Sequence, residues 1–324
     1  MKAKEKVSQL SSIIKDKLAP IVNNDYLLLD VPYYTNVGDT LIWQGTMDFL
    51  SDLPYRCLGM TNATGNIDFK ITKDTVILLQ GGGNFGDLWV LHQNFRKRII
   101  TQYPNNPIII LPQSIFFENR QRLEEDAAFF AGHPNVTICV RDRRSLEVLK
   151  KYYPNNSHLL LPDMAFCINA KSYGRGAKDE RDSLFVKRND KELSNEDSFS
   201  IVPPDAFVSD WLNCGNIRLY RIKDKLERYA HKIDKLCKTH IQCEVADYFW
   251  QNVLRQAQVQ YAINFLLPYK HIYTTRMHAA ILSVILEKEN ITLFDNSYGK
   301  LSSFTDAWLN DVDGLKIIGS KSKD

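Results

Sequence analysis

At 324 residues the chain is long enough for two domains of ordinary size, each with its own hydrophobic core. Its 41 Lys and Arg residues nearly balance its 38 Asp and Glu residues, which argues against the broad basic face of a nucleic-acid-binding protein. The six cysteines, at 57, 139, 167, 214, 237 and 243, lack the two-residue spacing of zinc and redox motifs, so we expect reduced thiols in a cytoplasmic protein.

The first twenty residues, MKAKEKVSQLSSIIKDKLAP, mix apolar and charged positions and lack the apolar core of a signal peptide. We expect them to form an exposed amphipathic helix. No stretch approaches the roughly 18 consecutive apolar residues of a membrane span. The sequence therefore predicts a soluble protein that could work beside a membrane.

Five short apolar runs in the first half predict buried parallel strands. Each is followed by a loop and a helical pattern, as in a doubly wound α/β sheet. The runs are Tyr26 to Asp30, Val76 to Gln80, Ile108 to Pro112, Thr137 to Arg141 and His158 to Pro162. Because open sheets bind ligands outside the carboxyl ends of their strands, the residues that follow these runs are the candidates for a binding site.

A change of composition divides the chain. Residues 170–183, AKSYGRGAKDERDS, lose hydrophobic periodicity and are charged and glycine-containing, as a linker is. We therefore expect one Rossmann-like domain over 1–169 and a second over 184–318, whose last helix could pack back on the first domain. In the second domain SLFVKR, SFSIV, HIYTT and NITLFD are candidate strands, and 220–239 and 248–266 are candidate helices.

The stretch LLQGGGNFGDLW, residues 78–89, places several glycines directly after a predicted strand. Gly81, Gly83 and Gly86 satisfy the G-x-G-x-x-G spacing that brings a pyrophosphate against a helix N-terminus. The acidic residue of a dinucleotide site about 20 positions later is absent from the sequence, as is the Lys-Ser/Thr of a P-loop. The ligand predicted here is an anion other than NAD or a Walker-type nucleotide.

The stretch NVGDTLIWQGTMDFL begins a predicted helix with Asn36 and Asp39 on either side of a glycine. One reading is that Asp39 is the N-cap of an ordinary helix. The other is a helix N-terminus directed at the cleft, where an anion or a hydroxyl group that needs a base could bind. Both readings can hold together.

The stretch TTRMHAAILSVILEKE carries an apolar stripe at helical spacing, with a cap at Thr274 or Thr275. Arg276 and His278 fall in the first turn, where the helix dipole disfavours cations. An anionic ligand would explain them, because Arg binds phosphate or carboxylate through two hydrogen bonds and His carries a movable proton. The alternative is an Arg paired with a neighbouring Asp and a His packed in the core.

Two further loops carry basic residues at predicted strand ends. Arg141 ends a strand in VRDRRSLEVLKK, and a structural ion pair is the commoner explanation for such an arginine. LFDNSYGK ends a strand with Asp295, Asn296, Tyr298 and Lys300. A turn accounts for the Asn-Ser and Gly residues, but it does not account for Lys300.

Seven motifs occur in the order of a known family. NVGD, GGGNFGD, LPQS, RD at Arg141, PDMAF, RMH and DNSYGK, over residues 33–304, together strongly resemble the polysaccharide pyruvyl transferases of exopolysaccharide gene sets. The resemblance implies a cytoplasmic enzyme with two Rossmann-like, doubly wound domains in a GT-B-like arrangement. It would transfer an enolpyruvyl carbon from phosphoenolpyruvate to a sugar of an exopolysaccharide or its lipid-linked precursor, and form a pyruvate ketal.

The resemblance also implies roles for single residues. The Arg-x-His pair that binds phosphoenolpyruvate in such families corresponds to Arg276 and His278, and the Asn-x-Gly-Asp carboxylate corresponds to Asp39. Arg188 falls where a donor-binding arginine is expected. We expect His278 and Asp39 to be the general acid and base, in either assignment.

The remaining expectations concern binding. Arg276, Arg141, Lys300 and Arg188 would neutralise the doubly anionic donor. Amide groups of the glycine loop would be exposed to the ligand. The acceptor side or its loops would comprise Asn36, Gly82, Gly83, Asn84, Asp87, Gln113, Ser114, Asn296 and Tyr298.

The expected partners are phosphoenolpyruvate and a saccharide, without nucleic acid, and with peripheral association with membrane-bound lipid-linked sugars. No cofactor is expected, because arginines can neutralise the donor, although Asp39, Asp87 and Asp163 leave room for a divalent metal. The sequence leaves the acceptor sugar and the oligomeric state undetermined. Two alternative functions stay open: a GT-B-type glycosyltransferase that uses a nucleotide sugar, and a non-catalytic binding protein of a polysaccharide gene cluster.

Overall fold

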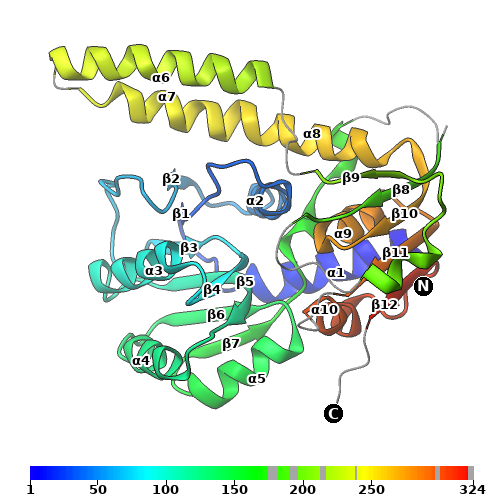
Figure 1. Ribbon diagram of the computed structural model, residues 1–324. Coiled ribbons are helices and arrows are strands. Elements are labelled where there is room, and N and C mark those ends of the chain that lie inside the picture. Colours follow the sequence, from blue (N-terminus) through cyan, green and yellow to red (C-terminus); the bar gives the residue numbers. More distant parts are fainter. Residues whose placement is uncertain (174–180, 190–195, 212–216, 238, 296–299, 320–324) are drawn as a thin grey trace.

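The computed structural model describes residues 1–173, 181–189, 196–211, 217–237, 239–295 and 300–319 of the chain. These residues form a mixed α/β structure with two parallel sheets. Figure 1 shows the sheets on opposite sides of helices α1 (Ala3–Leu18) and α9 (Met277–Ile285). Each half of the chain contributes one sheet.

The first sheet has the strand order β2-β1-β3-β5-β6-β7, with β4 also paired to β5, and every pair is parallel. Its strands are β1 (Tyr26–Leu29), β2 (Cys57–Thr61), β3 (Val76–Leu79), β4 (Gly82–Gly86), β5 (Ile108–Phe116), β6 (Val136–Val140) and β7 (Ser157–Leu160). All five predicted strands of this half are present. Its helices after α1 are α2 (Val37–Ser51), α3 (Val90–Gln102), α4 (Arg120–Ala131) and α5 (Arg143–Tyr152), followed by the 3₁₀ turns η1 (Met164–Cys167) and η2 (Ala170–Tyr173).

Successive residues of the first sheet enter different hydrophobic clusters. In β3, Val76 and Leu78 pack in one cluster with residues of α1 and α2. Ile77 and Leu79 pack in a second cluster with residues of α3, α4 and α5. The sheet is therefore covered by helices on both faces, as predicted for a doubly wound arrangement.

The second sheet has the order β12-β11-β10-β8-β9 and is also parallel. Its strands are β8 (Arg181–Val186), β9 (Phe207–Ser209), β10 (Tyr269–Thr274), β11 (Asn290–Phe294) and β12 (Leu315–Ile318). The helical elements besides α9 are η3 (Glu196–Ile201), α6 (Ile217–Cys237), α7 (Ile241–Phe249), the π-helical η4 (Trp250–Leu254), α8 (Arg255–Leu266) and α10 (Lys300–Trp308). The predicted strand SFSIV is wrong, because its residues lie largely in η3, where Phe199 packs against Phe185 and Phe294 of the sheet.

Regular structure extends into both ends of the predicted linker, 170–183. Residues 170–173 form η2. Strand β8 begins already at Arg181, whose amide donates a hydrogen bond to the carbonyl of Pro268 at 2.9 Å. Residues 174–180 lie outside the described part of the chain. The composition change thus marks the boundary between the sheets, but the extent of the linker was overestimated.

One hydrophobic cluster joins the two halves, where the sequence predicts two separate cores. It contains Ile14 of α1, Leu41 of α2, Val186 of β8 and Ile281 of α9. The apolar face of the N-terminal helix is the reason, since it packs between the sheets and its Leu18 is fully buried. The expectation of an exposed N-terminal helix is therefore wrong for that face.

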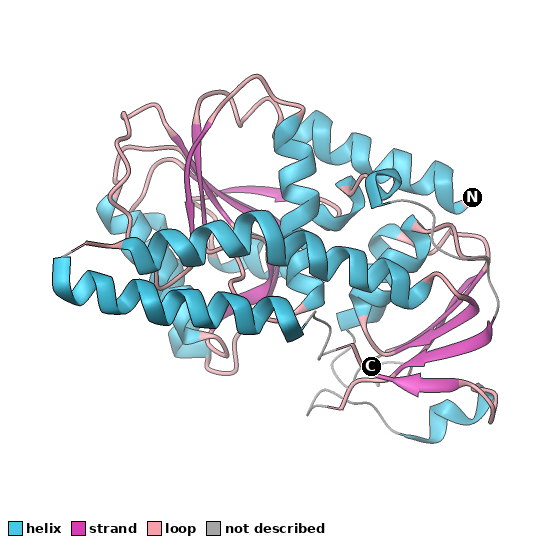
Figure 2. Cartoon of the chain, turned by 90° about the horizontal axis from the view of Figure 1, so that it is seen from above, coloured by secondary structure: helices cyan, strands magenta, loops and turns pink. Residues whose placement is uncertain are grey.

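Helices α6 and α7 form a hairpin that protrudes from the body of the protein, as Figures 1 and 2 show. Its base is held by Tyr33, which follows β1. The hydroxyl of Tyr33 donates to Asp247 at 2.7 Å, and the ring stacks on Trp250 at a centroid distance of 5.7 Å. The hairpin is therefore anchored to the carboxyl edge of the first sheet.

Candidate active site

His278 lies where the two sheets meet. It stands in the first turn of α9, directly after β10 of the second sheet. Its Nε2 atom is 3.4 Å from Oδ2 of Asp163, which follows β7 of the first sheet. Its Nδ1 atom is 2.5 Å from the place where a Cβ atom at Gly38, in the first turn of α2, would stand. The glycine thus lets the imidazole approach α2, and the N-termini of α2 and α9 come together.

The buried carboxylate of Asp163 is the partner of the His278 imidazole. This carboxylate also accepts hydrogen bonds from Nη1 of Arg141 at 2.6 Å and from the amide of Ala165 at 2.9 Å. Burial acts to raise the pKa of Asp163, but the charge and hydrogen bond of His278, with the charge of Arg141, outweigh it and hold the pKa well below 3.8. Because the carboxylate is ionised at neutral pH, Nε2 of His278 is its donor, and Nδ1 is the ring nitrogen that faces Gly38.

Arg141 does not face an open site. Its side chain is 3 % exposed, and it binds both Asp163 and, through Nε at 3.0 Å, the hydroxyl of Ser114. Trp308 of α10 donates to the Arg141 carbonyl at 2.8 Å. This burial contradicts donor binding by Arg141 and acceptor binding by Ser114. Arg141 instead binds Asp163, and Ser114 binds Arg141.

Asp39 is half-buried in the first turn of α2. Asn36 caps this helix, because its side chain accepts hydrogen bonds from the amides of Gly38 at 3.0 Å and Asp39 at 3.4 Å. The reading of Asp39 as the N-cap is therefore wrong. Its Oδ2 atom accepts a hydrogen bond from the hydroxyl of Tyr34 at 3.0 Å, and Oδ1 is 3.6 Å from the Cβ position at Gly82. The carboxylate lies between the start of α2 and the glycine-rich segment.

The glycine-rich segment forms a strand where the sequence predicts a loop. Residues 82–86 form β4, and the amide of Asn84 donates to the side chain of Gln113 at 3.3 Å. Gln113 is fully buried, because β5 continues beyond its predicted end at Pro112 to Phe116. The buried Gln113 is therefore closed to an acceptor sugar, whereas an acceptor contact of Asn84 stays a prediction. Gly82 on this strand lies beside Asp39.

Of four other predicted residues, the structure describes the side chain of Asp87 alone. The carboxylate of Asp87 accepts hydrogen bonds from two successive backbone amides before α4, at 2.8 and 2.9 Å. This contact fixes a loop, and a role of Asp87 in binding sugar hydroxyls stays a prediction. Asn296 and Tyr298 lie outside the described residues, and Lys300 begins α10 with a side chain that also lies outside them.

The carboxyl edge of the second sheet carries two half-buried arginines. Arg276 is the N-cap residue of α9, and its guanidinium forms a two-point ion pair with Asp210 at 3.1 and 2.7 Å. Its amide donates to the hydroxyl of Thr274 at 2.8 Å, but no side chain caps the first turn, so the predicted cap at Thr274 or Thr275 is wrong. Arg188 follows β8 and donates its amide to Thr275 at 2.9 Å. The alternative reading of Arg276, an ion pair with an Asp, is thus present in this structure.

The carboxyl edge of the first sheet carries a second polar cluster, which motif spacing in the sequence does not reveal. Asp30, 2 % exposed, follows β1 with a φ of 66°. Its carboxylate is 2.6 Å from Nδ1 of His92 and 3.5 Å from Nη2 of the buried Arg96. The ring of Tyr34 stands edge-on to His92, so this cluster adjoins Asp39. A non-glycine residue at positive φ is strained, and such strain concentrates at functional sites.

Gln80 adds an unsatisfied amide to this cluster. It follows β3, is 2 % exposed, and neither polar atom of its side chain has a hydrogen-bond partner within the described residues. Buried amides are rarely left in this state, which makes Gln80 a candidate ligand contact. The strand-end rule could have found Asp30 and Gln80, which end two predicted strands. His92 and Arg96 come from α3 and carry no motif.

Tyr34 is a permanent hydrogen-bond donor in this region. Burial of its hydroxyl group, followed by the negative charges of Asp39 and Asp30, raises its pKa well above 10. The phenol therefore stays protonated at neutral pH and holds the Asp39 carboxylate in place.

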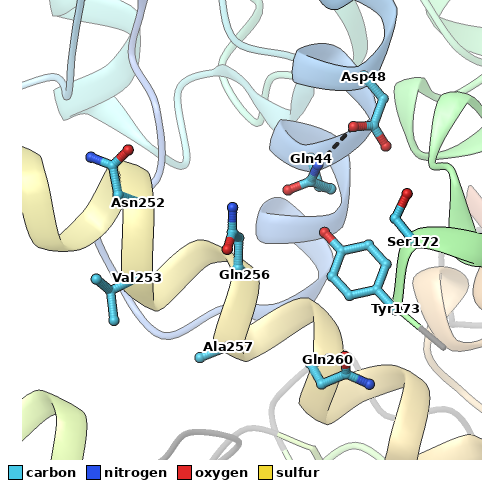
Figure 3. A pocket seen from close by; sticks show the side chains of 9 residues that line it. All are labelled: Gln44, Asp48, Ser172, Tyr173, Asn252, Val253, Gln256, Ala257 and Gln260. Atoms are coloured by element: carbon cyan, nitrogen blue, oxygen red, sulfur yellow. Dashed lines mark hydrogen bonds between the residues drawn. The ribbon is translucent and has the colours of Figure 1, made fainter. Parts of the chain in front are cut away.

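A cavity of about 540 Å³ lies between α2 and α8 (Figure 3). Its lining comprises Gln44, Asp48, Ser172, Tyr173, Asn252, Val253, Gln256, Ala257 and Gln260. None of these described side chains carries a positive charge, and none belongs to the predicted site. We therefore do not assign this cavity to a doubly anionic ligand.

Within the described residues, no three His, Cys, Asp or Glu side chains converge as metal ligands would. In the same part of the chain, no helix combines the length and the hydropathy that crossing a bilayer requires.

Comparisons with known proteins agree with the motif order. The family model of polysaccharide pyruvyl transferase matches residues 36–298. The chain is 33% identical to the putative pyruvyl transferase EpsO of Bacillus subtilis (strain 168), over 99% of this chain and 94% of that protein. It is 25% identical to pyruvyl transferase 1 of Schizosaccharomyces pombe, over 90% of this chain and 72% of that protein.

The fold is similar to that of a functionally uncharacterised protein from Klebsiella pneumoniae of known crystal structure, with a TM-score of 0.62 and 19% identity. The similarity covers 95% of this chain and 98% of the other, and at this identity it concerns the fold alone. The family match and the curated relatives confirm the resemblance read from the seven motifs: the chain belongs to the polysaccharide pyruvyl transferase family.

Proposed function

We propose that the protein transfers a pyruvyl group from phosphoenolpyruvate to two hydroxyl groups of a sugar in an exopolysaccharide or its lipid-linked precursor, and so forms a pyruvate ketal. Membership of the family supports pyruvyl transfer to a polysaccharide. The observation that carries the finer proposal is His278, which a buried carboxylate holds between the first turns of two helices. We also propose a GT-B-like arrangement, with the catalytic groups between the carboxyl edges of the two sheets.

The donor would bind at the paired helix N-termini. Both α2 and α9 present the positive end of their dipoles near His278, which favours an anion. Arg276 and Arg188 stand at the same edge of the second sheet and match the phosphate and carboxylate of phosphoenolpyruvate in charge. Since Arg276 is paired with Asp210, donor binding would draw the guanidinium from that carboxylate.

The proposed reaction is balanced in atoms and protons. The first sugar hydroxyl adds to C2 of the donor, while the methylene carbon takes up one proton and becomes a methyl group. The second hydroxyl then forms a bond to C2, and the bond between C2 and the phosphate oxygen breaks with its electron pair. The two sugar hydroxyl groups lose one proton each. One proton is balanced by the proton that the methyl group gains, and the other leaves with inorganic phosphate.

We assign the general acid to His278 and the general base to Asp39. Asp163 keeps the proton on Nε2, so that Nδ1 delivers a proton from the imidazolium form and regains it later. Tyr34 occupies Oδ2 of Asp39, which leaves Oδ1, beside Gly82, to accept the proton of a sugar hydroxyl.

The acceptor sugar would contact the cluster of Asp30, Gln80 and His92. This cluster adjoins Asp39 through Tyr34, so a sugar bound there would present its hydroxyls to the base. An amide, an imidazole and a carboxylate that converge in this way can bind several hydroxyl groups. The unsatisfied amide of Gln80 supports this placement.

Incubation of the protein with phosphoenolpyruvate and a panel of oligosaccharides tests the proposal. We expect release of inorganic phosphate only when a suitable saccharide is present, together with a product heavier by pyruvate less one water. His278→Gln should abolish both signals while a thermal shift on addition of phosphoenolpyruvate persists. His271→Gln, within β10, is the matched control and should retain activity.

Two results would contradict the proposal. Release of nucleotide from a sugar nucleotide, with no phosphate release from phosphoenolpyruvate, would assign the protein to the glycosyltransferases. Ligand binding without either reaction over the whole panel would indicate a non-catalytic binding protein.

A further inference from the structure

Helix α6, in the protruding hairpin of Figures 1 and 2, carries an exposed apolar stripe. Steps of three and four residues place the members of the stripe on one helix face. The stripe comprises Ile222 (40 % exposed), Leu226 (42 %), Tyr229 (54 %), Ile233 (45 %) and Leu236 (84 %). An exposed apolar surface of this continuity marks a place where another surface binds.

Basic side chains follow the stripe along one of its sides. At 3.6 residues per turn, six of them fall within about 100° of helix surface next to the stripe. All six are exposed, and no ion pair joins them to other described residues; they are Arg218, Arg221, Lys225, Arg228, Lys232 and Lys235. The seventh, Lys223, is buried on the other side, where it pairs with Asp224 and Glu227.

From this geometry we propose that α6 docks the protein on an anionic lipid surface. A helix with an apolar stripe and a row of Lys and Arg lies in the plane of a bilayer, with the stripe among the acyl chains and the basic row against phosphate groups. The charge of α6 fits such a surface, because seven Lys and Arg residues stand against three Asp and Glu residues.

The same charge pattern disfavours a second copy of the chain as the occupant. Two antiparallel α6 helices packed stripe to stripe would bring their basic rows together, and like charges across an interface repel. In a parallel pair the basic row would meet the other flank of the stripe, whose two carboxylates already have partners. Glu227 pairs with Lys223, and Asp234 accepts hydrogen bonds from Thr239 and from backbone amides at the start of α7.

A second exposed apolar segment stands at the sheet edge to which the hairpin is anchored. Leu88, Trp89, Val90 and Leu91, between β4 and the first turn of α3, are exposed by 51, 58, 49 and 54 %. Exposed apolar side chains at this edge are a second place where an apolar surface could bind.

Docking through α6 would place the active site near the membrane. This step rests on the proposed function. A lipid-linked acceptor carries its sugar close to the bilayer surface. Because Tyr33 ties the hairpin to the loop that leads to Tyr34 and Asp39, docking through α6 would hold the proposed base near such a sugar.

Co-sedimentation of the full chain with lipid vesicles tests the inference. We expect binding to equimolar phosphatidylcholine and phosphatidylglycerol, none to phosphatidylcholine alone, and a steep loss with added salt. Leu226→Ser combined with Ile233→Ser should weaken binding by about tenfold or more. Lys225→Gln combined with Lys232→Gln should weaken it roughly 25-fold, since each basic residue near an anionic surface contributes about fivefold.

Matched variants control for charge and for apolar area. Lys150→Gln combined with Lys151→Gln removes the same charge from exposed positions of α5, and Val208→Ser removes an exposed apolar side chain of β9. Both should bind vesicles as the unmodified chain does. All the variants change exposed positions, so their melting temperatures should match that of the unmodified chain.

Three outcomes would overturn the inference: no vesicle binding, equal binding to neutral and anionic vesicles, or equal loss in the α5 control. A dimer that Ile233→Ser abolishes, found by sedimentation equilibrium in a chain that does not bind vesicles, would assign the stripe to a second copy and would also overturn it. Vesicle binding is measured without phosphoenolpyruvate, so its failure is distinct from failure of the proposed transfer. The α6 variants should react with a soluble acceptor at the unmodified rate.

Discussion

Replacement of Asp163 by Asn tests the buried ion pair that positions His278. The amide keeps the size of the side chain and an oxygen for the Ala165 amide, but it removes the charge that faces Arg141 at 2.6 Å. Because the Arg141 side chain is only 3 % exposed, its charge would be left in the interior without compensation. Loss of one partner of a buried ion pair destabilises a protein by about 3–5 kcal/mol. We expect the free energy of unfolding to fall by this amount.

Thermal unfolding followed by circular dichroism measures the effect. For a chain of this size the loss corresponds to a melting temperature lower by roughly 10 °C. A second variant, Asp163→Asn combined with Arg141→Met, removes both charges. It should recover most of the stability, because apolar replacement of a complete buried pair is close to neutral. The pair of variants separates an uncompensated charge from the simple loss of a side chain.

The pH dependence follows from the lowered pKa of Asp163. The unfolded carboxyl group takes up its proton near pH 3.8, and the folded one does so only at lower pH. Its stabilisation is therefore complete above about pH 5 and is lost as the pH falls below 3.8 and through the folded pKa. The stability difference between the unmodified chain and Asp163→Asn should shrink as the pH falls below about 4.

An unchanged melting temperature in Asp163→Asn at neutral pH would refute this reasoning. A double variant no more stable than the single one would do the same. In turnover assays Asp163→Asn should lower kcat more than it raises the KM for phosphoenolpyruvate, because the imidazole loses the acceptor that orients it.

Three further substitutions test the geometry of the site. Gly38→Ala would place a methyl group 2.5 Å from Nδ1 of His278, so kcat should fall on the order of 10- to 100-fold; unmodified kcat would show that this close approach is not required. Gly86→Ala, at a φ of 132° and with its Cβ 1.7 Å from a carbonyl oxygen of β5, should lower the free energy of unfolding by about 2 kcal/mol or more. In urea denaturation Gly132→Ala, at a φ of −72°, is its near-neutral control, and equal losses would contradict the argument. Arg276→Ala should raise the KM for phosphoenolpyruvate about tenfold or more with a smaller effect on the acceptor KM; an unchanged donor KM would remove Arg276 from the donor site.

The five strands predicted in the first half are present because a parallel strand covered on both faces is a continuous apolar run. Val76–Leu79 is an example, with all four side chains buried. The strands that the pattern misses lack this signature. Strand β2 is only partly buried, and β4 is rich in glycine, so each resembles a loop in the sequence.

Strand ends predicted the site only in part. His278 and Asp39 were named from helix starts that follow apolar runs, and the structure brings those two helix starts together. Arg141 and Gln113 follow the same rule and are nevertheless buried. Their environment depends on Asp163 and on the length of β5, which neighbouring strands determine rather than the residues of the run itself.

The amino-acid sequence by itself determined the α/β class, the change from one sheet to the next and the family, because hydrophobic periodicity and motif order are local properties of the chain. Only the tertiary structure decided which charged groups face each other. The shared core that buries α1 brings β7, α2 and α9 to one point, and this packing turns Asp163 into the partner of both Arg141 and His278. Ion pairs form between groups that are close in space. No local pattern in the sequence indicates that residues 163 and 278 are close.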